Sequence, residues 1–169
     1  MSIRIREASA SDEAFMWRML GYAASDGDDE RTADDLRADP ALGRYVDGWG
    51  RTGDVGVVAV DGDDSKVGAA WIRLFSADRP GYGYIDVVTP ELTIACLASS
   101  RGVGVGRALI EALLDRARQA GFARVGLSVS QRNDRAKALY VSCGFQVLDP
   151  SANAPSERGS ITLVTSTGP

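Results

Sequence analysis

Three glycines at alternating positions, Gly102, Gly104 and Gly106, stand where the chain could bind an anion. They follow an apolar run with the character of a strand, residues 92–97, and precede a segment whose apolar residues repeat with helical spacing. Glycines at a strand-to-helix turn let backbone N–H groups approach a phosphate, and the positive end of the helix dipole adds to the attraction. The turn therefore predicts a phosphate site, and a tight connection without a ligand is the alternative.

The first turn of the expected helix supports this interpretation. It holds no Asp or Glu and no Ser or Thr cap, but it does hold Arg107. A cation at this end of a helix opposes the dipole at a cost of about 0.3–1 kcal/mol. A bound anion would offset that cost and accept hydrogen bonds from the N–H groups that have no partner within the helix.

Two other phosphate-binding motifs fit the turn poorly. The dinucleotide motif Gly-x-Gly-x-x-Gly, counted from Gly102, would place its third glycine at Arg107. The next expected strand, residues 125–129, is followed by Ser130 and Gln131 and not by the acidic residue that a ribose needs. A P-loop requires Gly-Lys-Ser/Thr, which the sequence lacks. A nucleotide-binding oxidoreductase is therefore the weakest hypothesis for this sequence.

The 169 residues include no histidine, and this narrows the chemistry. It excludes histidine-based catalytic triads, imidazole general bases and histidine-ligated zinc, and no metal site is expected. Proton transfer then falls to carboxylates, tyrosine, cysteine, lysine or water. The two cysteines, Cys96 and Cys143, each lie in an apolar stretch and are expected to be buried free thiols.

The net charge of −4 is spread unevenly. Residues 1–80 hold 10 Lys and Arg against 16 Asp and Glu, whereas residues 81–169 hold 9 against 7. The acidic half could favour a cationic substrate or be a solvated surface, and the surplus of positive charge in the second half is too weak for nucleic-acid binding.

No apolar run approaches the roughly 20 residues that span a bilayer, and the N-terminus is unlike a signal peptide. A cytoplasmic protein without nucleic-acid or membrane partners is expected.

The elements that would position these residues form a mixed order of strands and helices. Helices are expected after Ser9 and Ser11, over residues 32–38 and onward to 50, after Gly106, and over residues 133–143. Strands are expected over residues 3–6, 54–60, 66–74, 84–88, 92–97, 125–129, 145–148 and 161–165. Since the order has no repeat and no linker, residues 1–169 are expected to form a single α/β or α+β domain.

Two motifs, one in the glycine turn and one in the expected helix over residues 133–143 and the two residues after it, resemble those of the GNAT superfamily of N-acetyltransferases. The pyrophosphate motif of that family, (Gln/Arg)-x-x-Gly-x-(Gly/Ala), is matched by Arg101, Gly104 and Gly106. A second motif, Asn-x-x-Ala-x-x-Leu-Tyr-x-x-x-Gly-Phe, is matched in full by Asn133, Ala136, Leu139, Tyr140, Gly144 and Phe145. Either match could arise by chance, but the two together, about 30 residues apart, are specific. The strong resemblance covers residues 91–148.

The resemblance implies a fold and a co-substrate. The fold is a mixed, mostly antiparallel central sheet of six to seven strands with helices on both faces, splayed between strands 4 and 5. Acetyl-CoA would bind there, its pantetheine arm pairing with exposed backbone like an added strand. By position, Cys96 and Leu97 would supply that backbone. The pyrophosphate would be surrounded by Arg101, Gly102, Val103, Gly104, Val105, Gly106 and Arg107.

The resemblance also assigns roles to three side chains. Asn133 would bond the pantetheine arm or a water, with a helix N-cap as the alternative role. Tyr140 would be the general acid for the departing thiolate, with packing in the core as the alternative. Glu91 would be the base that deprotonates the amine, with an exposed charge at the strand end as the alternative and Asp86 as a reserve candidate.

The predicted activity is transfer of an acetyl group from acetyl-CoA to a primary amine of a small molecule or peptide, by direct attack in a ternary complex. A backbone N–H near Cys96 would stabilise the oxyanion. The alternative is a non-catalytic acyl-CoA-binding sensor or regulatory module. Homodimers are common in the family. The acceptor pocket is expected between the acidic residues 25–30, Trp49 and the loop 76–90 with Arg79, Tyr82, Tyr84 and Asp86.

Overall fold

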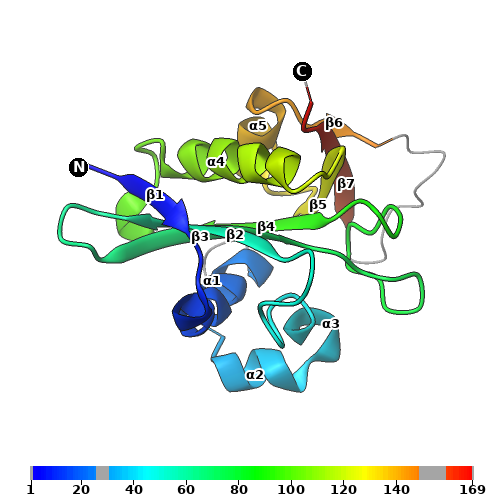
Figure 1. The fold of residues 1–169 in the computed structure, drawn as a ribbon, viewed down its shortest axis with the longest axis horizontal. Helices are drawn as coiled ribbons and strands as arrows, with labels where there is room; N and C mark the ends of the chain where they lie inside the picture. The colour runs from blue at the N-terminus through cyan, green and yellow to red at the C-terminus, as the bar shows by residue number, and fades with distance from the viewer. Residues whose placement is uncertain (1, 26–30, 149–158, 169) are drawn as a thin grey trace.

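The computed structural model describes residues 2–25, 31–148 and 159–168, and these residues build one sheet with helices on both faces (Figure 1). Seven strands lie in the order β1-β2-β3-β4-β5-β7-β6. All neighbours are antiparallel except β4 and β5, which are parallel. The strands are β1 (Arg4–Glu7), β2 (Val55–Val60), β3 (Lys66–Arg73), β4 (Glu91–Cys96), β5 (Arg124–Ser130), β6 (Gln146–Val147) and β7 (Ser160–Ser166).

The helices divide between the two faces of the sheet. On one face lie α1 (Glu13–Ala24), α2 (Ala33–Ala38) and α3 (Pro40–Gly43), and on the other lie α4 (Val105–Gln119) and α5 (Asp134–Ser142) (Figure 1). Short 3₁₀ turns, Ala10–Asp12 and Ala98–Ser100, precede α1 and follow β4. This arrangement confirms the mixed, mostly antiparallel sheet with helices on both faces that the resemblance implied.

Alternating residues of the central strands enter two separate cores. The core under α1 to α3 includes Val58, Val60, Ala69 and Trp71 with Met16, Trp17 and Leu20. The core under α4 includes Val57, Ala59, Ala70 and Ile72 with Leu109, Ile110 and Leu113. Burying each of the large α4 side chains contributes about 1.5–3 kcal/mol, so the sheet and α4 hold the glycine turn at a fixed place.

Local sequence signals explain where the helices begin and end. Ser9 and Asp12 form a capping box before α1, and Thr32 caps α2 by accepting a hydrogen bond from Asp35 N at 3.1 Å. The chain leaves α4 through Gly121, whose φ of 90° lies in the left-handed region that stops a helix, as predicted. No described helix has the length and apolar character needed to cross a bilayer.

The sheet opens between β4 and β5. Their register contains one pair, Glu91 opposite Gly126, and Gly126 N donates to Pro90 O at 3.0 Å. Beyond this point the two strands diverge, which confirms the splay expected between strands 4 and 5.

The predicted strand over residues 84–88 is wrong, because this segment belongs to a loop. Tyr84 N donates to Gly81 O at 3.2 Å, and Asp86 Oδ1 accepts from Val88 N at 3.0 Å, as in turns. Gly83 packs so closely on β5 that an added Cβ would lie 2.7 Å from the carbonyl carbon of Leu127. The helical region expected to reach residue 50 is also shorter, since turns follow the end of α3 at Gly43.

Candidate active site

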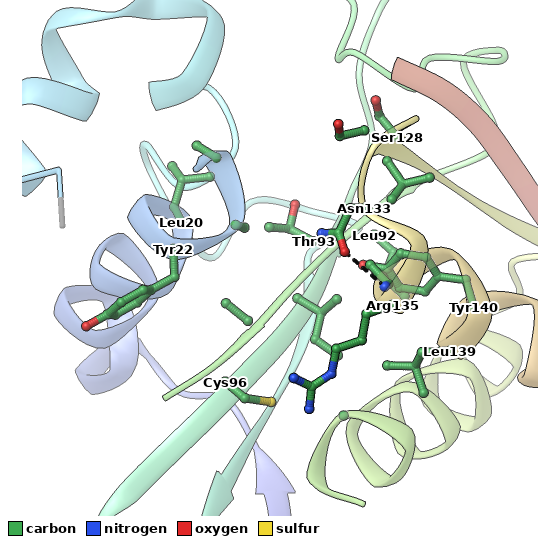
Figure 2. Close-up of a pocket in the computed structure, with 18 of the residues that line it drawn as sticks. Leu20, Tyr22, Leu92, Thr93, Cys96, Ser128, Asn133, Arg135, Leu139 and Tyr140 are labelled. Atoms are coloured by element: carbon green, nitrogen blue, oxygen red, sulfur yellow. Dashed lines mark hydrogen bonds between the residues drawn. The ribbon is translucent and has the colours of Figure 1, made fainter. Parts of the chain in front are cut away.

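A cavity of about 840 Å³ passes through the opening between β4 and β5. On one face of the sheet it is lined by the glycine turn and α5, and on the other by α1 and the residues around Tyr45. Figure 2 shows this arrangement, with Leu20 and Tyr22 of α1 on one side of β4 and Asn133, Leu139 and Tyr140 on the other. The predicted site residues in its lining are Glu91, Cys96, Arg101, Gly102, Gly104, Gly106, Arg107, Asn133 and Tyr140.

The glycine turn presents bare backbone to this cavity. Gly102 and Gly104 have φ values of 76° and 89°, which other residues rarely adopt, and Gly104 is the N-cap of α4. A Cβ added at Gly104 would meet no atom within 4 Å, so open space lies beside it. The first helical bond runs from Ala108 N to Gly104 O, at 3.1 Å. The N–H groups of residues 105–107 therefore have no acceptor within the helix.

The two arginines predicted to surround the pyrophosphate already contact the protein. Arg101 Nε donates to Cys96 O at 3.3 Å. Arg107 donates to Ser142 at the end of α5, at 2.7 Å to Oγ and 3.4 Å to the carbonyl oxygen. Arg107 thus connects the start of α4 to the end of α5 while still lining the cavity.

Arg135 is a further cation at this turn, and it was not among the residues predicted to bind the pyrophosphate. From the first turn of α5 it extends into the cavity (Figure 2), and its Nη2 lies 3.4 Å from the position of a Cβ added at Gly102. No hydrogen bond or ion pair engages its guanidinium within the part of the chain that the structure describes. Its position two residues after Asn133, inside the second motif, was the signal available in the sequence.

Along β4, the backbone N–H and C=O groups of successive residues point alternately toward β3 and toward the opening. Leu97 N donates to Val67 O at 2.8 Å, and the Leu97 carbonyl accepts from Ser100 N at 3.0 Å. The backbone groups predicted at Leu97 are therefore already bonded within the protein, which corrects that assignment. In an antiparallel pair the groups of every second residue point the other way, so those of Ile94 and Cys96 face the opening. Burial raises the pKa of the Cys96 thiol to about 11, so the thiol stays protonated.

Glu91 is buried at the start of β4, with 3% of its surface exposed, so the alternative of an exposed strand-end charge is wrong. Its Oε1 accepts from Tyr45 Oη at 2.6 Å and from Gly83 N at 3.0 Å. Its Oε2 is buried and has no hydrogen-bond partner among the described residues. Burial raises the pKa of this carboxyl to about 7, although the two donors act in the opposite direction.

Tyr140 lies in α5, and Asn133 is the N-cap residue of this helix. The apolar side of α5 packs against the core under α4. Tyr140 is half-buried and lies edge-on to Phe145, with ring centroids 5.9 Å apart. Asn133 Oδ1 accepts from Ala136 N at 3.0 Å, so Asn133 caps α5 (Figure 2). The capping alternative is thus confirmed, and Asn133 still lines the cavity.

Other predicted residues lie elsewhere. Asp86 pairs with Arg124 outside the cavity lining, and a hydrogen bond from Thr89 contributes most to lowering the pKa of its carboxyl, so it is a poor base. Of the residues expected to form the acceptor pocket, Tyr82 lines the cavity and Trp49, Arg79 and Tyr84 do not. Residues 26–30 lie outside the described chain. Where the chain is described, no cluster of three or more Cys, Asp or Glu could hold a metal ion.

Comparison with known proteins agrees with this geometry. Residues 14–145 match the model of the Acetyltransferase (GNAT) family. A mycothiol acetyltransferase from Beutenbergia cavernae is 33% identical over 114 residues, which cover 68% of this chain and 34% of that protein. The chain thus spans about a third of the length of this relative.

Solved structures share the fold. An acetyltransferase of the GNAT family from Staphylococcus aureus superposes with a TM-score of 0.70 at 15% identity, covering 99% of this chain and 100% of the other. An acetyltransferase from Salmonella typhimurium, solved with its cofactor acetyl-CoA, gives a TM-score of 0.70 at 20% identity and covers 99% and 95%. At these sequence identities the similarity supports a shared fold alone.

Proposed function

The chain belongs to the GNAT family of acetyltransferases, which are acyl-CoA-dependent N-acyltransferases, and we propose that it acetylates a primary amine of a small molecule or peptide by direct attack in a ternary complex. The observation that carries the proposal is that one cavity joins three features. These are the bare glycine turn at the start of α4, the hydroxyl-bearing Tyr140, and the buried carboxylate of Glu91. We further propose that the described elements act together as one acyltransferase domain.

The groups at the turn fit the co-substrate acetyl-CoA. Its pyrophosphate would accept hydrogen bonds from the N–H groups of residues 105–107 and lie between Arg101 and Arg135. The space beside Gly104 allows a phosphate to approach the backbone closely. The amide groups of the pantetheine arm would pair with the backbone of Ile94 and Cys96, as an added strand does.

Glu91 would supply the base. An amine with a pKa near 10.4 is almost wholly protonated at pH 7 and cannot attack a thioester. A carboxylate with a pKa of about 7 is deprotonated often enough to take the proton, directly or through water, and is basic enough to hold it. The freed amine nitrogen would then bond to the thioester carbonyl carbon, whose oxygen gains charge. The N–H of Cys96 would stabilise that charge.

Tyr140 would supply the acid. As the carbon–sulfur bond breaks, the sulfur leaves as a thiolate whose protonated form has a pKa near 8.5. The Tyr140 hydroxyl, of a type with a pKa near 10, would donate its proton to the sulfur and regain one from solvent. The attacking nitrogen would lose its second proton to water as the amide forms. The products would then be the acetylated amine, the free thiol of CoA and one net proton, because the nitrogen loses two protons and the sulfur gains one.

The acceptor would enter from the α1 side of the sheet. Leu20, Tyr22, Tyr45 and Tyr82 form the wall there, so an apolar or aromatic portion of the acceptor would pack against them. The similarity to a mycothiol acetyltransferase supports a small-molecule amine as the first acceptor class to test.

A panel of amines tests the proposal. The full chain would be mixed with acetyl-CoA and, separately, with amino acids, amino sugars, polyamines and short peptides, and the released thiol would be measured. We expect thiol release with at least one class of amine. We also expect calorimetry to show that the chain binds acetyl-CoA, whether or not an amine reacts. Binding without release on any amine would favour the acyl-CoA sensor, and absence of binding would overturn the assignment of the turn.

A further inference from the structure

The loop before β4 and the turn after α3 enclose the carboxylate of Glu91. Three consecutive loop residues, Gly81, Tyr82 and Gly83, and one turn residue, Tyr45, contact Glu91 or the hydroxyl bonded to it. In the function proposed above the two loop glycines have no role, and Tyr45 only lines the wall that the acceptor would contact. The inference drawn from them rests on that proposed function, because it concerns how its base is held.

A directed chain of donors ends on one oxygen of Glu91. Tyr82 N donates to Tyr45 Oη at 2.8 Å, so the hydroxyl uses a lone pair there and directs its own proton to Glu91 Oε1, 2.6 Å away. Gly83 N donates to the same oxygen at 3.0 Å. Burial raises the pKa of the Tyr45 hydroxyl well above its ordinary value, so Tyr45 remains a donor throughout the physiological range. Oε1 therefore has two donors.

The other oxygen, Oε2, is enclosed but has no partner among the described residues. Gly81 packs directly on it, since an added Cβ would clash with Oε2 and lie 2.9 Å from Tyr45 Oη. Gly83 fits equally tightly against the backbone of Leu127 and Ser128. Both glycines are thus required by close packing, and together they let the loop approach the carboxylate.

Tyr45 is itself fixed by the sheet. Trp71 Nε1 donates to Tyr45 O at 3.0 Å, and Arg73 donates to Arg44 O at 2.9 Å and to Asp47 O at 2.6 Å. The ring of Tyr45 packs edge-on against Phe75, with centroids 5.0 Å apart. Because these contacts hold both the backbone and the ring, the hydroxyl cannot leave Oε1 without disturbing β3.

We propose that Tyr45 is a positioning residue for the acyl transfer, which with the N–H of Gly83 holds Oε1 of Glu91, fixes the orientation of the carboxylate and favours its charged form. The proton moves from the ammonium nitrogen through water to the Glu91 carboxylate and later passes to solvent. Tyr45 keeps its own proton throughout and does not touch the reacting atoms.

The charged groups around Glu91 do not replace this effect of Tyr45. Arg73 is opposite Glu91 in the register of β3 and β4, but its guanidinium pairs with Asp54 at 2.7 Å. On the loop, the Tyr82 ring stacks on the Tyr45 ring, and from β5 the residue opposite Glu91 is Gly126, which carries no titratable group. The hydrogen bond from Tyr45 therefore favours the charged form of Glu91 against the effect of burial.

A titration of Glu91 without substrates tests the network. The full chain would carry ¹³C-labelled glutamate, and the Glu91→Gln variant would identify the Glu91 carboxyl resonance. We expect a midpoint at a pH of about 7 in the wild type. Tyr45→Phe keeps the ring and removes the donor, so the midpoint should rise by about one pH unit. The matched control is Tyr84→Phe, on the same loop but outside the cavity lining, which should leave it unchanged. Equal midpoints in all three proteins would overturn the proposal.

A stronger donor should act in the opposite direction. Fluorotyrosine at position 45 keeps the size of the ring and makes the hydroxyl more acidic, so the Glu91 midpoint should fall. This variant also covers the case in which Tyr45→Phe fails to fold, since it leaves every hydrogen bond in place. An unmoved or raised midpoint with fluorotyrosine would contradict the proposed role.

Kinetics separate this inference from the proposed function. In Tyr45→Phe the acid limb of kcat/KM for the amine should move to higher pH, with a loss of about fivefold at pH 7, recovery at pH 9 and an unchanged KM for acetyl-CoA. If the titration shifts but no amine is acetylated, the network stands and the proposed function fails. If an amine is acetylated while the midpoint and the acid limb stay in place, Tyr45 only packs and the inference fails.

Discussion

Arg107 at the start of α4 donates a hydrogen bond to Ser142 Oγ at the end of α5, at a distance of 2.7 Å. This contact connects the two helices that flank the glycine turn. It also gives Arg107 a structural role, although its place beside the glycines had predicted a phosphate ligand. The cation that faces the turn without such a contact in the described chain is Arg135.

The first prediction therefore separates Arg135 from Arg107. Arg135→Gln should weaken acetyl-CoA binding by about tenfold, because a charge-assisted hydrogen bond to a phosphate is lost, and the loss should shrink at high salt. Arg107→Gln should lower the melting temperature more than it lowers the affinity. Arg132→Gln, a nearby arginine outside the cavity lining, is the control. Calorimetric titration measures the affinity, and equal affinities for Arg135→Gln and Arg132→Gln would contradict the assignment.

A second prediction concerns the open space beside Gly104. Gly104→Ala adds a Cβ that meets no protein atom but forces alanine to a φ of 89°, at a backbone cost of about 1 kcal/mol. The methyl group would also occupy space that a phosphate needs, so affinity for acetyl-CoA should fall. Gly121→Ala is a matched control, because its φ is 90°, its added Cβ also meets nothing, and it lies at the far end of α4.

The two variants should have similar stability and different affinity. Acetyl-pantetheine, which lacks the pyrophosphate, should react equally well with both. Should Gly104→Ala bind acetyl-CoA as tightly as Gly121→Ala does, the phosphates lie elsewhere.

Tyr140→Phe provides the third prediction. The ring keeps its edge-on contact with Phe145, so the fold and the affinity for acetyl-CoA should be unchanged. Turnover should fall by about a hundredfold, because the thiolate leaves without a positioned proton donor. A steady-state assay of thiol release measures the loss, and Tyr84→Phe serves again as the control. Normal turnover in Tyr140→Phe would remove this residue from the mechanism.

The local parts of the site could be predicted from the sequence, and the parts that depend on distant pairing could not. The glycine turn, α4 and α5 follow from signals within a few residues, such as the spacing of Gly102, Gly104 and Gly106. Tyr45 is 46 positions from Glu91, in a segment without any motif, so its hydrogen bond follows only from the packing of β3 against the turn after α3.

Register explains the error at Leu97. In an antiparallel pair only every second residue of β4 directs its backbone N–H and C=O to β3, and the others direct them to the opening. Which residues do so depends on the register, and a pattern of apolar residues does not determine it. The strand wrongly expected over residues 84–88 has a similar cause. Its apolar alternation resembles a strand, yet the close contact of Gly83 with the β5 backbone holds the segment as a loop.

The buried state of Glu91 leads to a fourth prediction, on the free energy of unfolding. The pKa of this carboxyl is about 7 in the folded protein and 4.5 as its ordinary value, so the folded state binds the proton more tightly. The contribution of Glu91 to the free energy of unfolding is then fully present below pH 4.5. It decreases as the pH rises to 7, by about 3 kcal/mol at most. Glu91→Gln, which cannot titrate, should lack this component.

Urea unfolding of both proteins at pH 5 and pH 7.5 measures the effect. Other titrating groups contribute equally to the two proteins, so they cancel when the pH-dependent change in Glu91→Gln is subtracted from that of the wild type. The remaining difference should show the wild type losing more stability on going to pH 7.5. A difference of zero would mean that Glu91 titrates as an exposed carboxylate does, and it would then be too weak a base to deprotonate an amine near neutral pH.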